Sequence, residues 1–530
     1  MKRLLLFVSL ATMAISAKAQ TPKIPGCAAE DKDGIMAAGY WEIWNDDEQK
    51  RIDEDIEAYR KADAVFKTGR IKKGTKVKVE QTASEFVFGA SAFNWNQLGS
   101  YKANAAYRNV FGTLFNRATI PFYWKDFEPV PGRMRFEESV IDTEKWWNIC
   151  GNTKFQPNWR RPATDPIVKW CNDHKVAVHG HPLVWGSRKW QYPTWMQYDG
   201  VPENERRALD SLEIIIFSSG AKHVPSYKTM SEEEIAAILP EYLKHQEQRT
   251  LQRAIDIMDR YKGRVQSWDV VNESAWDFRD GLQDPSLPMC KSRYGILFSD
   301  YTYKAFKAVG AHRTDGSLLN INDYATDDSY PSQIEDLLSR GAEINVIGSQ
   351  MHLFSPQQCL DIAAGKHLKD KSHDRFIEPE QIRGFFSKFE KFGIPVCLSE
   401  ITITSAGNGE RGEMIQAIIA RNLYRMWFSV PNMMGITWWN VVDDCGAPGE
   451  PTISGIFHRD MSPKTVYYAL DQLINHEWRT NVELTPDSKG NISWRGFKGT
   501  YLISWTDAKG VAHSEELIIS GDSKSGSDSR

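Results

Sequence analysis

The chain repeats one unit, in which a short apolar strand is followed by a loop and an amphipathic helix. We expect strands near 86–90, 117–122, 176–181, 267–272, 317–322, 345–350, 395–400 and 435–439. Helical periodicity falls between them, for example at 165–174, 249–262, 301–309 and 414–428. Strands that alternate with helices form parallel sheets, and eight such units close into a barrel. The sequence therefore predicts an α/β fold, a (β/α)8 TIM barrel with long loops and a small C-terminal β appendage.

The remaining parts of the 530 residues differ from the barrel in composition. We predict a signal peptide at 1–19, an irregular segment at 20–45, the barrel at 46–476, a β-rich appendage at 477–520 and a disordered tail at 521–530. The appendage has short alternating runs and turn signals, and the tail is rich in Ser, Gly and Asp. The barrel range is expected to begin with a helix at 46–66, where apolar residues recur at helical spacing.

The connection from Pro182 to Arg264 is much longer than the others. It contains two polar, helix-prone segments, Glu203–Glu213 and Ser231–Tyr242. A long connection on the carboxyl side of a barrel strand usually shapes a cleft. An inert surface insertion is the alternative.

The first residues have the pattern of a secretory signal. Met1-Lys2-Arg3 is followed by the apolar run Leu4–Ile15 and by the small-residue site Ala17-Lys18-Ala19. The run is too short for a permanent membrane span, and Cys27 lies too far beyond it to favour a lipid anchor. We expect cleavage before Gln20 and an exported protein, periplasmic or extracellular.

Two of the predicted strands end on a glutamate. Trp268–Glu273 is an apolar run that ends on Asn272 and Glu273, and Ile394–Glu400 ends on Glu400. The carboxyl ends of barrel strands meet at one mouth, where α/β barrels place their chemistry. Two carboxyl groups that face each other across a groove are the minimum equipment for cleaving a glycosidic bond.

Four more strand ends bring polar or aromatic groups to the same mouth. These candidates are His181, Trp185, Asn322, Tyr324, Gln350, His352 and Trp439. Each alone is more often a packing residue than a site residue. Together with Asn272 and the two glutamates they form a constellation that chance explains poorly.

Composition agrees with a carbohydrate groove. The chain has 19 Trp, 19 Tyr and 24 Phe, and flat aromatic faces stack on sugar rings, although most of these residues belong to the core. The formal charge of −4 gives no reason to expect nucleic acid or an anionic membrane as a partner. The seven cysteines are scattered and form no metal-binding pattern.

The motifs resemble glycoside hydrolase family 10, whose best-known members are endo-β-1,4-xylanases. The resemblance runs from about residue 50 to 475 and is carried by GHPLVW at 180–185, WDVVNE at 268–273, NDY at 322–324, GSQMH at 348–352, SE at 399–400 and TWW at 437–439. It implies a retaining mechanism, with Glu273 as acid/base and Glu400 as nucleophile. It also implies xylan or decorated xylan as substrate. No cofactor or metal is expected, since carboxylates alone carry the chemistry.

The resemblance suggests roles for the supporting residues. His352 would hold Glu400 charged and oriented, and Asn272 would hold the sugar 2-hydroxyl. Gln350 would position Glu273 or the adjacent water. His181 and Trp185 would shape the floor of the sugar site, and Trp439 would cover it. Asp269 is expected to be a structural partner inside the barrel.

The chain also departs from the family pattern beside the catalytic centre. At the end of strand two the family carries Glu-Asn-x-Met-Lys-Trp, whereas this chain has Thr119–Trp124. Gly186 stands where the family usually has His, and Thr402 where it has Asp. Ala325 replaces an Asn, and the expected second Trp is absent from 443–451. Because of these changes, another β-linked polysaccharide remains an alternative substrate.

Two other functions fit part of the pattern. A metal-dependent hydrolase could use His179, His181 and His352 with the glutamates, but no further ligand has suitable spacing. A catalytically silent glycan-binding protein fits the altered strand-two end. Such a protein has little need of an acid and a nucleophile together.

Overall fold

The computed structural model describes residues 21–67, 71–72, 74–150, 160–187, 190–218, 229–292, 294–366 and 377–520. The predicted signal peptide and the predicted disordered tail lie outside the described residues.

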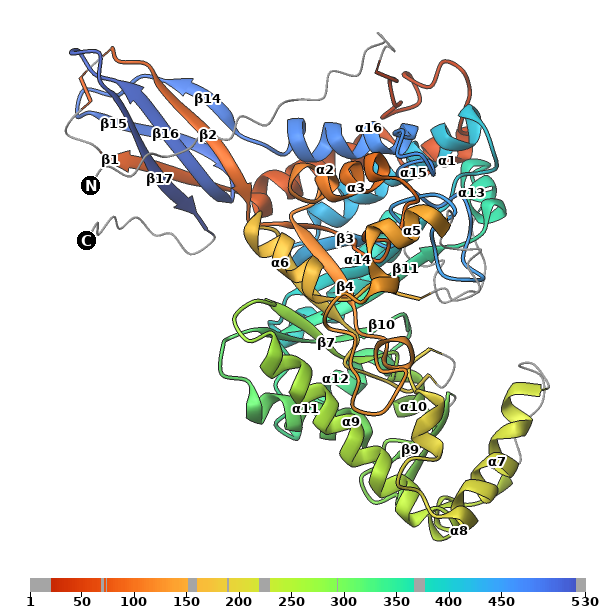
Figure 1. The fold of residues 1–530 in the computed structure, drawn as a ribbon. Coiled ribbons are helices and arrows are strands. Elements are labelled where there is room, and N and C mark those ends of the chain that lie inside the picture. Colours follow the sequence, from red (N-terminus) through yellow and green to blue (C-terminus); the bar gives the residue numbers. More distant parts are fainter. Residues whose placement is uncertain are drawn as a thin grey trace.

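Within these residues, eight parallel strands close into a barrel (Figure 1). In chain order they are β3 (Val87–Ser91), β4 (Arg117–Pro121), β5 (Ala177–His181), β7 (Ser267–Asn272), β10 (Leu318–Asp323), β11 (Val346–Leu353), β12 (Val396–Ile403) and β13 (Met433–Trp438). The ring closes because β13 pairs with β3 and β7 pairs with β10. A short strand, β6 (Val184–Trp185), adds to β7. The predicted (β/α)8 barrel is confirmed, and every predicted strand overlaps an observed one.

Burial on both faces explains why these strands could be predicted from the sequence. Every residue of β7, β11 and β12 is buried. Strands of a parallel barrel are covered by side chains inside and helices outside, so they appear in the sequence as continuous apolar runs.

Helices surround the barrel. They are α2 (Asp46–Arg60), α3 (Tyr101–Thr113), α4 (Trp124–Phe127), η1 (Val140–Asp142), α5 (Glu144–Cys150), α6 (Asp165–Asp173), α9 (Pro240–Arg260), α10 (Ala275–Arg279), α11 (Tyr301–His312), α12 (Ser329–Ser339), α13 (Pro356–Ala363), α14 (Pro379–Ser387), η7 (Glu390–Phe392), α15 (Glu410–Ser429), α16 (Thr465–Asp471) and η8 (Gln472–Glu477). Most of α15 is buried, as expected for a helix between the barrel and α2, α13 and α16.

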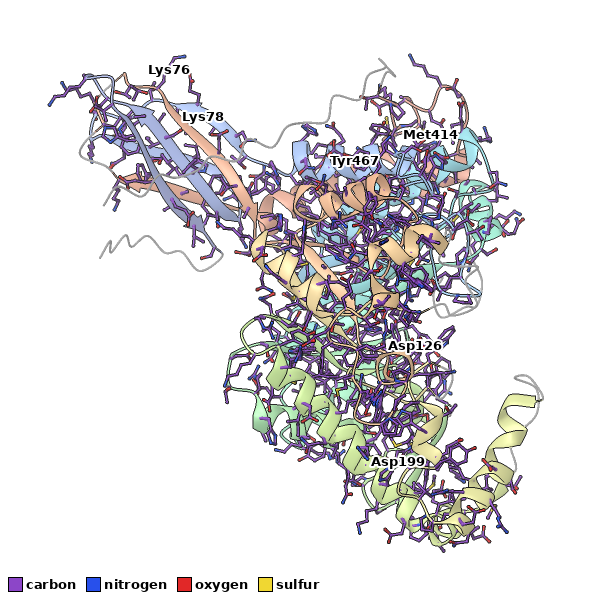
Figure 2. All side chains as sticks on the ribbon, viewed as in Figure 1. Lys76, Lys78, Asp126, Asp199, Met414 and Tyr467 are labelled. Carbon is purple, nitrogen blue, oxygen red and sulfur yellow. The ribbon has the colours of Figure 1, made fainter. Side chains whose placement is uncertain are left out.

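Both ends of the chain build the β appendage. It combines β1 (Lys61–Lys67) and β2 (Val77–Ser84) with β14 (Asn481–Leu484), β15 (Asn491–Phe497), β16 (Gly499–Thr506) and β17 (Ala512–Ile519). β1 pairs with β15, and the other four form a sheet in the order β14-β2-β16-β17. The appendage has its own apolar core, which includes Val77, Ile503 and Trp505. In Figure 2 the side chains of Lys76 and Lys78 project from it, far from Asp126.

This pairing differs from the predicted divisions in three places. The helix expected at 46–66 ends at Arg60, and Lys61–Lys67 continues as a strand because its buried Ala64 and Phe66 pack into the appendage core. Residues 61–84, assigned from the sequence to the barrel range 46–476, pair with strands of the range 477–520. The segment 20–45, expected to be irregular, contains a short helix, α1 (Ala38–Ile43), because Tyr40 and Trp41 are buried against the barrel core.

The long connection after β5 forms an arm beside the barrel. It consists of η3 (Thr194–Gln197), α7 (Glu203–Ser218), α8 (Glu232–Ile238) and the start of α9, and in Figure 1 α7 and α8 stand out from the barrel. The arm shares a small apolar core with a β-hairpin, β8 (Met289–Ser292) and β9 (Gly295–Phe298). The sequence did not predict this hairpin. Its two strands are only four residues long and lie inside a barrel connection.

In the part of the chain that the structure describes, no helix has both the length and the apolar character needed to cross a membrane.

Candidate active site

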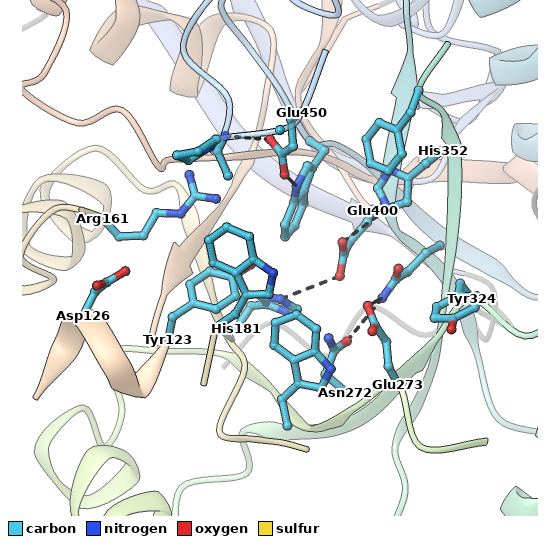
Figure 3. A pocket seen from close by; sticks show the side chains of 18 residues that line it. Tyr123, Asp126, Arg161, His181, Asn272, Glu273, Tyr324, His352, Glu400 and Glu450 are labelled. Atoms are coloured by element: carbon cyan, nitrogen blue, oxygen red, sulfur yellow. Dashed lines mark hydrogen bonds and ion pairs between the residues drawn. The ribbon is translucent and has the colours of Figure 1, made fainter. Parts of the chain in front are cut away.

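The carboxyl ends of the barrel strands surround a pocket of about 380 Å³ (Figure 3). Nine of the ten predicted site residues line it: His181, Trp185, Asn272, Glu273, Tyr324, Gln350, His352, Glu400 and Trp439. The tenth, Asn322, lies directly behind the pocket and contacts both Asn272 and Glu400. The structure therefore brings the whole set together, and the roles given to its members stay predictions.

Glu273 is held at the end of β7 by an unusual backbone turn. Its φ is +54°, in the left-handed region that non-glycine residues rarely adopt and that often marks functional sites. Its N–H donates to the Asn322 carbonyl at 2.8 Å. The following loop is fixed by Asp323, which accepts hydrogen bonds from the N–H groups of Ala275 and Ala325, each at 2.8 Å. These contacts aim the Glu273 side chain into the pocket.

Glu400 lies within β12 and faces the same pocket. The Asn322 side-chain amide donates to its Oε1 at 2.7 Å. His181 Nε2 lies 3.7 Å from Oε1, and His352 Nε2 lies 3.4 Å from Oε2. The register of β11 and β12 places His352 beside Glu400, because Gln350 pairs with Glu400 and His352 with Thr402.

A chain of side-chain amides joins the two glutamates. Asn322 Nδ2, which donates to Glu400, also donates to Asn272 Oδ1 at 2.8 Å. Gln350 Nε2 donates to the same Asn272 oxygen and to Glu273 Oε1, both at 3.3 Å. Gly348 leaves room for this network, since a Cβ there would lie 2.9 Å from Asn322 Oδ1. The spacing of the two carboxyl groups is therefore fixed by neutral groups.

Asp269 orients His181 from inside the barrel. Its Oδ2 lies 2.8 Å from His181 Nδ1 and 2.9 Å from His179 Nε2, and His179 Nδ1 contacts Ser267 Oγ at 2.8 Å. This agrees with the structural role expected for Asp269. His179 and His181, the pair on which the metal-dependent alternative depended, are therefore both occupied by contacts with neighbouring side chains. Among the described residues, no three His, Cys, Asp or Glu side chains are grouped as ligands for a metal ion.

Burial dominates the titration of the site. It raises the pKa of Glu400 to about 7, although the nearby His181 and the Asn322 hydrogen bond act in the opposite direction. Burial also raises the pKa of Glu273, and the charge of Glu400 adds to this, while hydrogen bonds from Tyr294 and Gln350 lower it. Burial alone would lower the pKa of His181, but the charge of Glu400 and the Asp269 contact raise it on balance.

His352 is neutral by the same physics. Burial lowers its pKa to about 4. Its Nδ1 lies 2.9 Å from the hydroxyl of Thr402, the residue that stands in place of the family's Asp, and its ring stacks on Phe354 at 4.4 Å. A hydroxyl fixes the ring orientation without adding a charge that would favour the imidazolium.

One end of the pocket is formed by residues that the sequence did not single out. Trp439 donates through Nε1 to Glu450 at 3.4 Å, and Glu450 also accepts from the Ala447 N–H at 2.8 Å. Arg161 lies over the rings of Phe93 and Tyr123, at 4.2 Å and 5.5 Å, and Asp126 completes this end (Figure 3). Arg161 and Glu450 come from loops and Asp126 from the short helix α4, where no strand-end pattern marks them.

Tyr294 is the other residue that the sequence missed. It lies in the tight connection of the β8–β9 hairpin, and its hydroxyl donates to Glu273 Oε2 at 2.7 Å. The first strand of the hairpin reads Met-Cys-Lys-Ser and the connection reads Arg-Tyr, which is neither an apolar run nor a typical turn pair, so no sequence pattern marked Tyr294.

Comparison with known proteins identifies the family. The model of "Glycosyl hydrolase family 10" matches residues 134–473. The chain belongs to glycosyl hydrolase family 10. The match begins just after the strand-two end, where the chain departs from the family's pattern, and it includes both glutamates and the amides that join them.

Named relatives of this family 10 chain share low identity with it. It is 24% identical over 305 residues to "Endo-1,4-beta-xylanase A" of Halalkalibacterium halodurans, covering 54% of this chain and 63% of that protein. It is 28% identical over 196 residues to "Endo-1,4-beta-xylanase A" of Xylanibacter ruminicola, covering 36% and 40%. The chain thus spans less than two thirds of the length of these relatives. A solved family 10 structure from Paenibacillus barcinonensis is 20% identical, with a TM-score of 0.46 and coverage of 73% and 94%.

Proposed function

We propose that the protein is a retaining glycoside hydrolase that cleaves β-1,4-xylosidic linkages in xylan or decorated xylan. The observation that carries the proposal is the pair of carboxyl groups of Glu400, which is buried, and Glu273, which is half-buried; both line one pocket and are joined by amides. Retaining enzymes need one carboxyl as acid/base and a second as nucleophile, held at a fixed separation. Family membership and the named relatives support this chemistry and this substrate.

The proposed mechanism assigns one step to each glutamate. Glu400 attacks the anomeric carbon, while Glu273 gives its proton to the leaving-group oxygen. Water, deprotonated by Glu273, then releases the sugar from Glu400. The Asn322 hydrogen bond and the cationic form of His181 favour the ionised nucleophile. The negative charge of Glu400 in turn favours the protonated form of Glu273.

The remaining residues bind and orient the sugar in this proposal. Asn272 lies between the two carboxyl groups, where it can hold the sugar 2-hydroxyl. Trp439 supplies a stacking face, and it contacts the edges of His181 and His352. Arg161, Asp126 and Glu450 line one end of the pocket. We propose that they take the place of the polar residues absent from the end of strand two and set which decorated xylan the pocket accepts. Export, predicted from residues 1–19, is part of the same proposal, because the polymer lies outside the cell.

The test is product analysis with the wild type and Glu400→Ala on linear xylan, arabinoxylan, glucuronoxylan, β-glucan and mannan. We expect the wild type to release xylo-oligosaccharides and Glu400→Ala to be inactive. Added azide should restore part of the activity on aryl xylosides, with inverted product, because a small anion replaces the missing carboxylate. Full activity of Glu400→Ala would refute the nucleophile assignment. Activity on β-glucan or mannan alone would move the same mechanism to another substrate.

A further inference from the structure

The β8–β9 hairpin brings a phenol to the carboxyl group of Glu273. The Tyr294 hydroxyl donates to Glu273 Oε2 at 2.7 Å and lies 3.5 Å from the Tyr324 hydroxyl. The bond from Gln350 to the other oxygen, Oε1, is longer, at 3.3 Å. Tyr294 therefore makes the shorter of the two side-chain hydrogen bonds to this carboxyl.

The hairpin is held in place by the buried carboxylate of Asp277. Ser292 Oγ donates to Asp277 Oδ2 at 2.6 Å, and Tyr301 donates to the same oxygen at 2.9 Å. The Tyr294 N–H donates to Ser292 Oγ at 3.1 Å. Asp277 lies in α10, four positions after Glu273, so the hairpin and the acid/base loop share one support.

The arm holds the hairpin from outside. Met289 and Ile296 are fully buried against Leu239 and other residues of α7, α8 and α9. Lys291 Nζ lies 3.0 Å from the carboxylate of Glu232 in α8 and donates to the Met230 carbonyl at 2.9 Å. The long connection after β5 therefore supports the element that carries Tyr294.

Gly186 provides the space that Tyr294 and its hairpin occupy. A Cβ at this position would lie 3.0 Å from Leu297 Cδ1, 3.3 Å from Ser292 Oγ and 3.5 Å from Tyr294 Cδ2. The neighbouring Trp185 ring meets the Tyr294 ring edge-on at 6.1 Å. A larger side chain at 186 would displace the hairpin, so the glycine and the tyrosine form one arrangement.

We propose that Tyr294 is a positioning residue for the acid/base carboxyl: its hydroxyl holds Glu273 Oε2, so that Oε1 is the oxygen that carries and transfers the proton. This inference rests on the proposed function. Glu273 Oε1–H gives its proton to the leaving-group oxygen as the glycosidic bond breaks, and the electron pair of that bond stays on the same oxygen. Throughout, Tyr294 keeps its own proton and its bond to Oε2.

The hydrogen bond has a measurable electrostatic consequence. A donor to an ionised carboxylate stabilises the ionised form, so removing the hydroxyl raises the pKa of Glu273 further. The other titratable groups that face Glu273 come from different elements: Glu400 of β12, His181 of β5, Asp323 of β10, Tyr324 beyond β10 and Tyr123 beyond β4. All of these groups remain in a Tyr294→Phe variant, so any change in the pKa of Glu273 reports the loss of the Tyr294 hydroxyl alone.

The experiment compares the wild type with Tyr294→Phe, which keeps the ring against Trp185. We expect the alkaline limb of kcat/KM on a xylo-oligosaccharide to move up by about one pH unit, since a hydrogen bond to a charged group is of that size. We also expect kcat/KM to fall about tenfold on this substrate and much less on an aryl xyloside, whose good leaving group needs little proton transfer. The matched control is Tyr303→Phe, whose hydroxyl donates to the Arg340 carbonyl at 2.9 Å, and its profile should equal that of the wild type.

A direct titration separates this inference from the proposed function. Carboxyl ¹³C NMR, with Glu273→Gln used to assign the resonance, reports the pKa of Glu273 without turnover. An upward shift in Tyr294→Phe supports the hydrogen bond even if the wild type cleaves no xylan, an outcome that would refute only the proposed substrate. An unchanged pKa and pH profile, with equal losses on both substrates, would show that Tyr294 has only a structural role.

Discussion

Burying the ionised carboxylate of Glu400 in the active site lowers the stability of the folded protein. Its pKa of about 7 in the folded protein lies above the 4.5 of an exposed glutamate. Between these values the folded state binds a proton that the unfolded state releases, so stability falls as the pH rises through this window. Above the folded pKa the cost is complete, and below about pH 4.5 it is absent.

We therefore predict that Glu400→Gln stabilises the protein at pH 8 by about 3 kcal/mol, which corresponds to the rise in pKa from 4.5 to about 7. The gain should shrink as the pH falls and should be nearly absent at pH 4. Thermal unfolding at a series of pH values measures it. Glu515→Gln, at an exposed position of β17, is the control and should change little at any pH. A gain of equal size at pH 4 and pH 8 would show that charge burial is not its source.

At the scale of elements, the sequence was most informative where both faces of a strand are buried. The eight barrel strands were predicted because burial makes them continuous apolar runs. The ten predicted site residues come together because they stand in the carboxyl-terminal halves of strands or just beyond them. Lys61–Lys67 was missed because its strand conformation comes from pairing with β15, more than 400 residues later in the chain. Tyr294, Arg161 and Glu450 were missed because they lie on connections, whose positions depend on tertiary packing.

The arm and the hairpin share one apolar core, so a cavity in that core should destabilise both. Leu239 is fully buried between them, and we predict that Leu239→Ala destabilises this unit by about 2–4 kcal/mol through the cavity it creates. Hydrogen exchange should show faster opening of β8 and β9, and kcat/KM should fall in the same substrate-dependent way as in Tyr294→Phe.

Ile503→Ala is the matched cavity control, because Ile503 is equally buried but belongs to the appendage core. It should lower the unfolding free energy without changing the pH profile. If both variants altered the profile alike, the arm would have no specific connection to Glu273.

At the scale of the whole molecule, the appendage depends on both ends of the chain. Val77 and Val79 of β2 are fully buried by strands that begin after residue 480. We predict that a chain ending at Glu477 is less soluble and has a lower Tm than the full chain, because β1 and β2 keep unpaired edges and exposed apolar faces. A chain ending at Ser520 keeps every pairing of the appendage and serves as the control. Equal solubility and equal Tm of the two shortened chains would contradict this prediction.

The pairing of β1 with β15 and of β2 with β14 and β16 also sets an order of events in time. Strands β1 and β2 are synthesised before any barrel strand, yet their partners are synthesised after the last barrel strand. Contacts between such distant parts of a chain form slowly, and an unpaired apolar strand is open to wrong partners while it waits. The barrel can close before the appendage does. Until the C-terminal strands dock, the apolar faces of β1 and β2 stay exposed and can lead to aggregation of the newly made molecule.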